Sequence, residues 1–182
     1  MNLLINDAIT LTPFSTADVP NMVKYLNDEE VYNNTLKIPK NYGERDAHAF
    51  LKMVEERQQR AGQQTEWSIR HREEGLIGGI GRMILYGVEA HKDEIGYWLA
   101  KPFRRQGIMS AVVQRFSDFC IQERKLARVE ARAFSHNVGS RKVLERAGFR
   151  QEGYMNKCEY KNGVFIDCYL YARIAGLPTK GN

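Results

Sequence analysis

The chain has 182 residues, of which 43% are apolar and 27% are charged, so it has the length and composition of one soluble globular domain. Its net charge is +5, but acids are interspersed among the lysines and arginines, which argues against a dedicated nucleic-acid-binding module. No apolar run reaches the roughly 18–20 residues that a membrane helix needs, and the first residues lack a secretory pattern. We therefore expect a cytoplasmic protein with no membrane contact.

The cysteines and histidines do not indicate a metal site or a disulfide framework. Cys120, Cys158 and Cys168 are odd in number and widely spaced, so we expect buried free thiols. The four histidines never fall at metal-ligand spacing with each other or with a cysteine. No metal is expected.

The first half of the chain predicts strands and amphipathic helices. Period-two alternation predicts the strands, and apolar side chains at spacings of three and four predict the helices. Ser15 and Asp18 have the spacing of a capping box. The predicted strands are residues 9–13, 67–72 and 76–86, the helices 15–27 and 44–61, and the loop 37–43.

Three glycines in the predicted strand 76–86 suggest a dinucleotide-binding fingerprint, which we reject. Gly78, Gly79 and Gly81 lack the further glycine of that motif, and no helix follows them. We interpret them as glycines of a sheet.

The second half alternates between strands and helices, and the class is therefore α+β with a mixed sheet. Gly148 has the position of a helix C-cap, and Asn162-Gly163 has the composition of a hairpin turn. The predicted strands are residues 94–100, 128–134 and 149–174, the helices 107–123 and 137–147, and the loop 101–106.

The basic loop before the helix 107–123 is the most informative feature of the sequence. Free backbone N–H groups at a helix start, preceded by arginines and a glycine, can hold a pyrophosphate. No Walker A sequence is present, so nucleotide hydrolysis is not indicated. A capped surface loop with two solvated arginines, Arg104 and Arg105, explains the same residues, and on these residues alone both interpretations stay open.

Three motifs in order resemble the GNAT superfamily of acetyl-CoA-dependent N-acetyltransferases. Residues 104–109, Arg-Arg-Gln-Gly-Ile-Met, resemble its R/Q-x-x-G-x-G/A signature, and residues 94–99 resemble its fourth strand. Residues 137–149 resemble the N-x-x-S…G-F run of the RimJ/RimL-like branch, the ribosomal-protein N-terminal acetyltransferases. The likeness covers nearly the whole chain.

The resemblance implies a single GNAT-type domain over residues 1–182, in which about the last eight residues form a flexible tail. Its mixed, mostly antiparallel sheet is flanked by helices and splays between strands 4 and 5, where the pantetheine of acetyl-CoA lies. Pantetheine would pair with backbone at Trp98 and Leu99 and reach Asn137. The implied pyrophosphate-binding amides belong to Arg104, Arg105, Gln106, Gly107, Ile108, Met109 and Ser110. Met109 departs from the usual Gly or Ala, and its side chain either packs inward or crowds the loop.

Transfer of the acetyl group to an amine needs a neutral amine and a proton for the departing thiolate. The resemblance implies that Ser140 supplies that proton, and its alternative role is helix capping together with Asn137. Glu94 could deprotonate the amine, and its alternative is an exposed strand-end carboxylate. The sequence has no G-x-S-x-G elbow, so direct transfer is expected.

We therefore expect an acetyl-CoA-dependent N-acetyltransferase that acts on a primary amine, such as a protein N-terminal α-amino group. A small-molecule amine is the alternative acceptor. A module that binds acyl-CoA without catalysis is the alternative outside the enzymes, because a fold alone does not guarantee chemistry. A homodimer is compatible with each of these.

Overall fold

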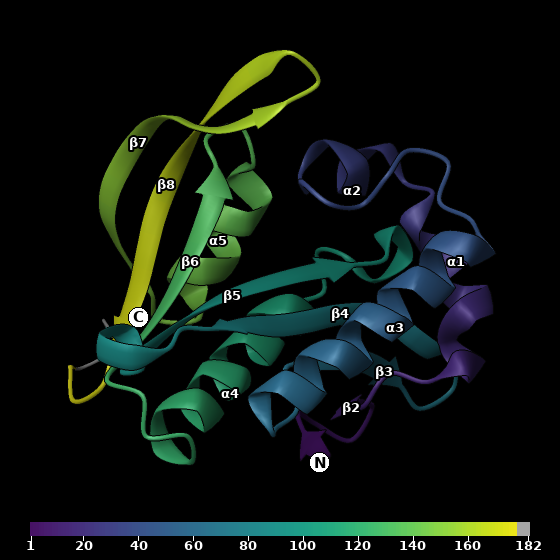
Figure 1. Cartoon of the computed structure of the whole chain (residues 1–182), viewed down its shortest axis with the longest axis horizontal. Coiled ribbons are helices and arrows are strands. Elements are labelled where there is room, and N and C mark those ends of the chain that lie inside the picture. The colour runs from purple at the N-terminus through teal and green to yellow at the C-terminus, as the bar shows by residue number, and fades with distance from the viewer. Residues whose placement is uncertain (178–182) are drawn as a thin grey trace. The chain divides into compact units, whose positions relative to one another are not determined.

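The computed structural model describes residues 1–177, and the strands in them form a mixed sheet in the order β1-β2-β3-β4-β5-β6-β8-β7 (Figure 1). The strands are β1 (Leu3–Leu4), β2 (Ile9–Thr12), β3 (Glu66–His71), β4 (Gly75–Ile84), β5 (Lys92–Leu99), β6 (Arg128–Phe134), β7 (Arg150–Lys161) and β8 (Val164–Ile174). The helices are α1 (Val19–Leu26), α2 (Glu29–Asn33), α3 (Glu44–Ala61), α4 (Ile108–Gln122) and α5 (Val138–Arg146). Short 3₁₀ turns are η1 (Thr16–Asp18), η2 (Gly87–Glu89) and η3 (Lys101–Phe103). The predicted α+β class with a mixed sheet is confirmed.

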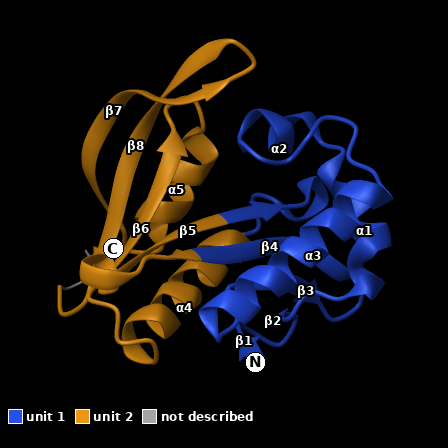
Figure 2. Ribbon diagram, viewed as in Figure 1, with its two compact units in different colours: residues 1–82, 97–106 blue, residues 83–96, 107–182 orange. Residues whose placement is uncertain are grey.

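The chain divides into two compact units whose segments interleave along the sequence (Figure 2). Unit 1 consists of residues 1–82 and 97–106, and unit 2 of residues 83–96 and the described residues from 107 onward. The predicted domain boundaries, residues 1–182, stay a prediction. The predicted tail includes residues 178–182, which lie outside the described residues.

Unit 1 is an antiparallel sheet with helices packed on it. β2 pairs with β3, β3 pairs with β4, and α1 packs against α3. The predicted strands 67–72 and 76–86 therefore form an antiparallel pair, and the predicted helix over residues 44–61 is confirmed. The helical part of the core contains Val19, Met22, Leu26, Val31, Tyr42 and Ala47, together with Leu76 of β4.

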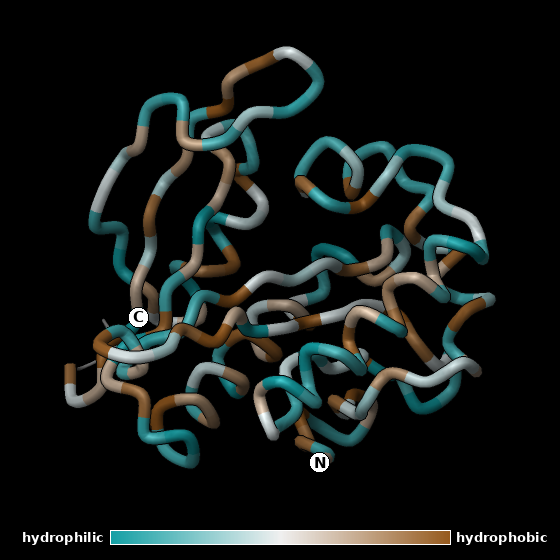
Figure 3. Tube along the Cα trace, viewed as in Figure 1, coloured by the Kyte–Doolittle hydropathy of each residue, from teal (hydrophilic) through white to brown (hydrophobic). Residues whose placement is uncertain are grey.

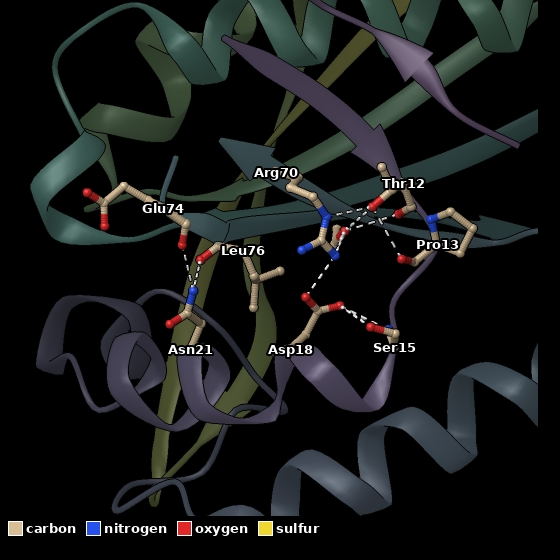
Figure 4. A network of polar contacts seen from close by, with 9 residues as sticks. Thr12, Pro13, Ser15, Asp18, Asn21, Arg70, Glu74 and Leu76 are labelled. Carbon is tan, nitrogen blue, oxygen red and sulfur yellow. Dashed lines mark hydrogen bonds and ion pairs between the residues drawn. The ribbon is translucent and has the colours of Figure 1, made fainter. Parts of the chain in front are cut away.

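A buried polar network fixes the start of α1 to β3 (Figure 4). Asp18 is only 1% exposed, and its Oδ1 lies 2.8 Å from Nη2 of Arg70. Its Oδ2 accepts the backbone N–H of Ser15 at 2.9 Å, which confirms the predicted capping box. A buried carboxylate is tolerated when it is paired and hydrogen-bonded, so the capping residue also serves as a tertiary anchor.

Unit 2 is built around β6, which pairs in parallel with β5 and antiparallel with β8. The parallel ladder contains three pairs, from Lys92 opposite Arg128 to Glu94 opposite Glu130. β5 is the strand that the resemblance matched to the fourth strand of the family, and its pairs with β6 cover residues 92–94. α4 and α5 contact each other and β6.

The β7–β8 hairpin extends past the end of β6, because β6 pairs with β8 only between Cys168 and Ile174 (Figure 1). Its turn has positive φ at Asn162 and Gly163, as predicted for an Asn-Gly hairpin. Near the turn, the side chains of Val164 and Phe165 are exposed, and the trace there is apolar (Figure 3).

Three features were not predicted from the sequence. β1 and α2 are only two and five residues long, too short to show a periodic pattern. The third is Cys158, which is partly exposed, whereas Cys120 and Cys168 are buried as expected. None of the helices in residues 1–177 is long and apolar enough to cross a membrane.

Candidate functional site

Two glycines of β4 let the end of β5 approach closely. A Cβ atom on Gly78 would lie 2.6 Å from the Trp98 carbonyl oxygen, and one on Gly79 would lie 2.7 Å from the Trp98 indole Nε1. Any larger residue would force β4 away from Trp98. The sheet interpretation of these glycines is therefore confirmed, and they determine where the Trp98 backbone lies within unit 1.

Arg104 is engaged on three sides within unit 1. Its Nε donates to the Leu99 carbonyl oxygen at 2.9 Å, its Nη1 lies 2.7 Å from Glu30 Oε2, and its Nη2 lies 3.3 Å from Asp28 Oδ2. The side chain is 19% exposed. The alternative of a solvated arginine is therefore wrong for Arg104.

Arg105 has the opposite environment. It is exposed, and within residues 1–177 its side chain has no hydrogen-bond or ion-pair partner. Its φ of 64° lies in the left-handed region, which residues other than glycine seldom adopt. The next residue, Gln106, donates from Nε2 to the Pro102 carbonyl at 2.9 Å.

Gly107 is the N-cap of α4 and has φ of 79°, which favours glycine. No side chain caps this helix, and a Cβ on Gly107 would meet no atom within 4 Å. The N–H groups of Ile108, Met109 and Ser110 have no intrahelical acceptor, and the helix dipole is positive at this end. The Met109 side chain is 6% exposed, so of its two alternatives the structure shows inward packing.

Asn137 is the N-cap of α5, and its Oδ1 accepts the backbone N–H of Ser140 at 2.9 Å. Ser140 is thus the third residue of the helix, and it takes part in the cap through its backbone. The predicted alternative for Ser140, helix capping together with Asn137, is therefore present through its backbone N–H.

Glu94 lies in a cross-strand chain of ion pairs in unit 2. Its Oε1 is 2.8 Å from Arg132 Nε, and Arg132 Nη1 is 2.8 Å from Glu159 Oε1. The pKa of Arg132 is raised, mainly by its hydrogen bond to Glu94. The Glu94 side chain is 20% exposed, so the alternative of an exposed strand-end carboxylate is wrong.

The predicted site residues lie in both units. In unit 1, Trp98 and Leu99 lie at the end of β5, and Arg104 binds the Leu99 carbonyl. In unit 2, Asn137 and Ser140 share one capping hydrogen bond, whereas Glu94 contacts Arg132. Gln106 and Gly107 join the two parts of the predicted loop through one peptide bond.

Sequence reasoning missed three residues that hold the predicted ones in place, Asp28, Glu30 and Arg132. Asp28 accepts the Val31 N–H as the N-cap of α2, and an Asp directly before two glutamates was a usable helix-start signal. Charged residues alternate along β6 at Arg128, Glu130 and Arg132, which could have indicated an ion-paired face. Among the described residues, no group of three or more potential ligands could hold a metal.

Comparison with known proteins identifies relatives that are named as acetyltransferases. The probable N-acetyltransferase YjcK of Bacillus subtilis is 37% identical over 97 residues, 53% of this chain and 54% of that protein. The ribosomal-protein-serine acetyltransferase of Escherichia coli is 37% identical over 81 residues, 44% of this chain and 45% of that protein. The chain therefore spans about half the length of these curated relatives.

Solved structures show the same fold. RimL, a ribosomal alpha-N-protein acetyltransferase solved in complex with coenzyme A, superposes with a TM-score of 0.83 at 21% identity, over 96% of this chain and 98% of that one. The family described as acetyltransferase (GNAT) domain matches residues 8–150, which is most of the chain. The chain therefore belongs to the GNAT acetyltransferase family.

Proposed function

We propose that the protein transfers the acetyl group of acetyl-CoA directly to a primary amine. The observation that carries the proposal is the start of α4, where Gly107 adopts a left-handed conformation and no side chain caps the helix. The first-turn N–H groups then have no partner in the helix and suit a pyrophosphate, which their partial positive charge attracts. Relatives with acetyltransferase names and membership of the GNAT family support acetyl-CoA as the ligand.

In this proposal, backbone groups hold most of the coenzyme. The amides from Arg104 to Ser110 hold the pyrophosphate, and the backbone of Trp98 and Leu99 pairs with pantetheine. The Leu99 carbonyl already accepts a hydrogen bond from Arg104, so only its second lone pair is left for the ligand. The Oδ1 of Asn137 caps α5, so this side chain would reach pantetheine through its amide nitrogen.

The two arginines of the loop have different roles in this proposal. Exposed charges attract phosphates over a Debye length of about 8–10 Å at 0.1–0.15 M salt. Arg105 is exposed and has no ion-pair partner in residues 1–177, so we assign the salt-dependent attraction to Arg105. Arg104 is paired with Asp28 and Glu30, so it is given no such role here.

The reaction forms one C–N bond and breaks the thioester C–S bond, and it moves one proton from the amine to the thiolate. We assign proton donation to the thiolate to Ser140, because it matches the serine that the family resemblance places near the thioester sulfur. Glu94 is the proposed base for the ammonium. Its carboxylate lies 2.8 Å from Arg132 Nε, so it would accept the proton through water or after separating from Arg132.

We propose a protein N-terminal α-amino group as the acceptor, because relatives include a ribosomal-protein-serine acetyltransferase. The test incubates the protein with acetyl-CoA and measures free thiol with a chromogenic disulfide. The acceptors are short peptides with a free N-terminus, the same peptides with a blocked N-terminus, and small amines. Thiol release only with free N-termini supports the proposal. Release only with small amines would contradict the N-terminal acceptor and identify a small-molecule amine instead.

The test also separates the enzyme from a binding module. If calorimetry shows CoA binding but no thiol is released with any acceptor, the proposed transferase activity is wrong and the proposed coenzyme binding stands. If CoA does not bind, both are wrong.

A further inference from the structure

We propose that Arg104 is a positioning residue that fixes α2 to the end of β5, at the first residue of the proposed coenzyme loop. The three contacts of its guanidinium reach two separate segments of unit 1. Nε contacts the last residue of β5, and the two terminal nitrogens contact Asp28 and Glu30 at the start of α2. The consequences for the reaction rest on the proposed function, whereas the positioning itself does not.

α2 needs such support because it has only five residues. Helices shorter than roughly 12–15 residues are marginal in water without tertiary contacts. Its contacts include the buried side chain of Val31 and the cap in which Asp28 Oδ1 accepts the Val31 N–H at 3.0 Å. Arg104 adds a charged contact from a segment more than 70 residues away in the sequence, and its bond to Glu30 joins positions separated by 74 residues.

The contacts of Arg104 differ in weight. Glu30 is 64% exposed, and exposed ion pairs contribute little because water screens them. Asp28 is 12% exposed and Arg104 is 19% exposed, so their pair is mostly shielded from water. We therefore expect Asp28 to be the main partner, although its 3.3 Å distance is longer than the 2.7 Å of the Glu30 pair.

The arrangement connects the two substrates of the proposed reaction. The loop that begins at Arg104 would hold coenzyme, and α2 belongs to the first helices, which lie outside the motifs assigned to coenzyme and could select the amine. A coenzyme that orders residues 104–110 would also restrain Arg104 and, through Asp28, α2. Coenzyme binding should therefore stiffen α2 without touching it.

Hydrogen exchange of the 182-residue chain tests this directly, with CoA as the probe. The backbone N–H groups of Tyr32 and Asn34 donate to the Asp28 and Glu30 carbonyls, so their exchange reports the opening of α2. In Arg104→Ala we expect this exchange to become roughly tenfold faster, as typical of a lost charge-assisted hydrogen bond. Arg105→Ala, the matched control in the next residue, should leave it unchanged.

Asp28→Asn isolates the ion pair, since asparagine keeps an oxygen for the helix cap and loses only the negative charge. We expect faster exchange in α2 for this variant too, and a smaller effect for Glu30→Gln. Because these variants preserve side-chain size, they keep the proposal testable if Arg104→Ala does not fold. Combining Asp28→Asn with Arg104→Ala should add little to either single change.

Addition of saturating CoA to the wild type should slow exchange at Tyr32 and Asn34, and this slowing should disappear in Arg104→Ala but persist in Arg105→Ala. Without CoA, equal exchange at Tyr32 and Asn34 in the wild type, Arg104→Ala, Asp28→Asn and Glu30→Gln would overturn the positioning role. A baseline change with no response to bound CoA would overturn the coupling. If CoA does not bind to the wild type, the proposed function fails, and the baseline comparison still decides the role of Arg104.

Discussion

The contrast between Asn137 and Ser140 allows chemistry and helix capping to be separated at the start of α5. The capping hydrogen bond runs from the Ser140 backbone N–H to the Asn137 side chain, so Ser140→Ala leaves both of its atoms in place. Asn137→Ala removes the acceptor. The two substitutions should therefore affect different properties of the protein.

The magnitudes follow from these contacts. Loss of an N-cap costs about 1 kcal/mol of unfolding free energy, within a range of roughly 0.5–2 kcal/mol. For a chain of this size, such a loss lowers Tm by about 2–4 °C, which we expect for Asn137→Ala. Ser140→Ala keeps the capping hydrogen bond, so its Tm should fall less than that of Asn137→Ala. If Ser140 protonates the departing thiolate, the kcat of the Ser140→Ala variant should fall roughly 10²–10⁴-fold.

The assay combines thermal unfolding with steady-state thiol release at saturating acetyl-CoA. Ser140→Thr, which keeps a hydroxyl, is the control and should retain more activity than Ser140→Ala. A burst measurement shows whether chemistry limits turnover, since slow product release would hide the effect. An unchanged kcat in Ser140→Ala would remove Ser140 from the catalytic residues, and a Tm loss equal to that of Asn137→Ala would show that its hydroxyl supports the helix.

Further predictions concern the loop, the sheet and a buried tyrosine. Gly107→Val should raise the Kd for CoA at least about tenfold, and an unchanged Kd by calorimetry would contradict the loop assignment. Its loss of stability should be modest, because φ of 79° costs a non-glycine residue about 1–2 kcal/mol and no atom lies within 4 Å of the new Cβ. Gly78→Ala should destabilise unit 1 by about 1–3 kcal/mol, because its Cβ would lie 2.6 Å from the Trp98 carbonyl oxygen. Gly153→Ala is the control, because the atom nearest to its new Cβ lies 3.9 Å away, and it should unfold like the wild type in denaturant. Burial raises the pKa of Tyr42 to about 12, so its contribution to stability is complete below pH 10 and is lost as the pH rises from 10 to 12. The ultraviolet titration of the wild type minus that of Tyr42→Phe should show this late ionisation, and a difference curve centred near 10 would refute it.

Sequence patterns alone determined most of the elements and the place of the loop. The helix over residues 44–61 has the bounds that its apolar spacing predicts, and Gly107 lies at the start of α4, where the basic loop was predicted to meet a helix. Such signals are local, because they depend on side-chain periodicity and on the backbone freedom of single residues. The same locality explains why α2 and β1 were missed, since both are too short for their periodic pattern to recur.

Only the tertiary structure decided which charged side chains are available to a ligand. Arg104 and Arg105 are adjacent and chemically identical, yet Arg104 is neutralised by acids about 70 residues earlier in the chain and Arg105 is exposed. In the same way, Glu94 is paired with Arg132 on the neighbouring strand β6. Ion pairing depends on distances between segments that are remote in sequence, and a linear pattern contains no information about those distances.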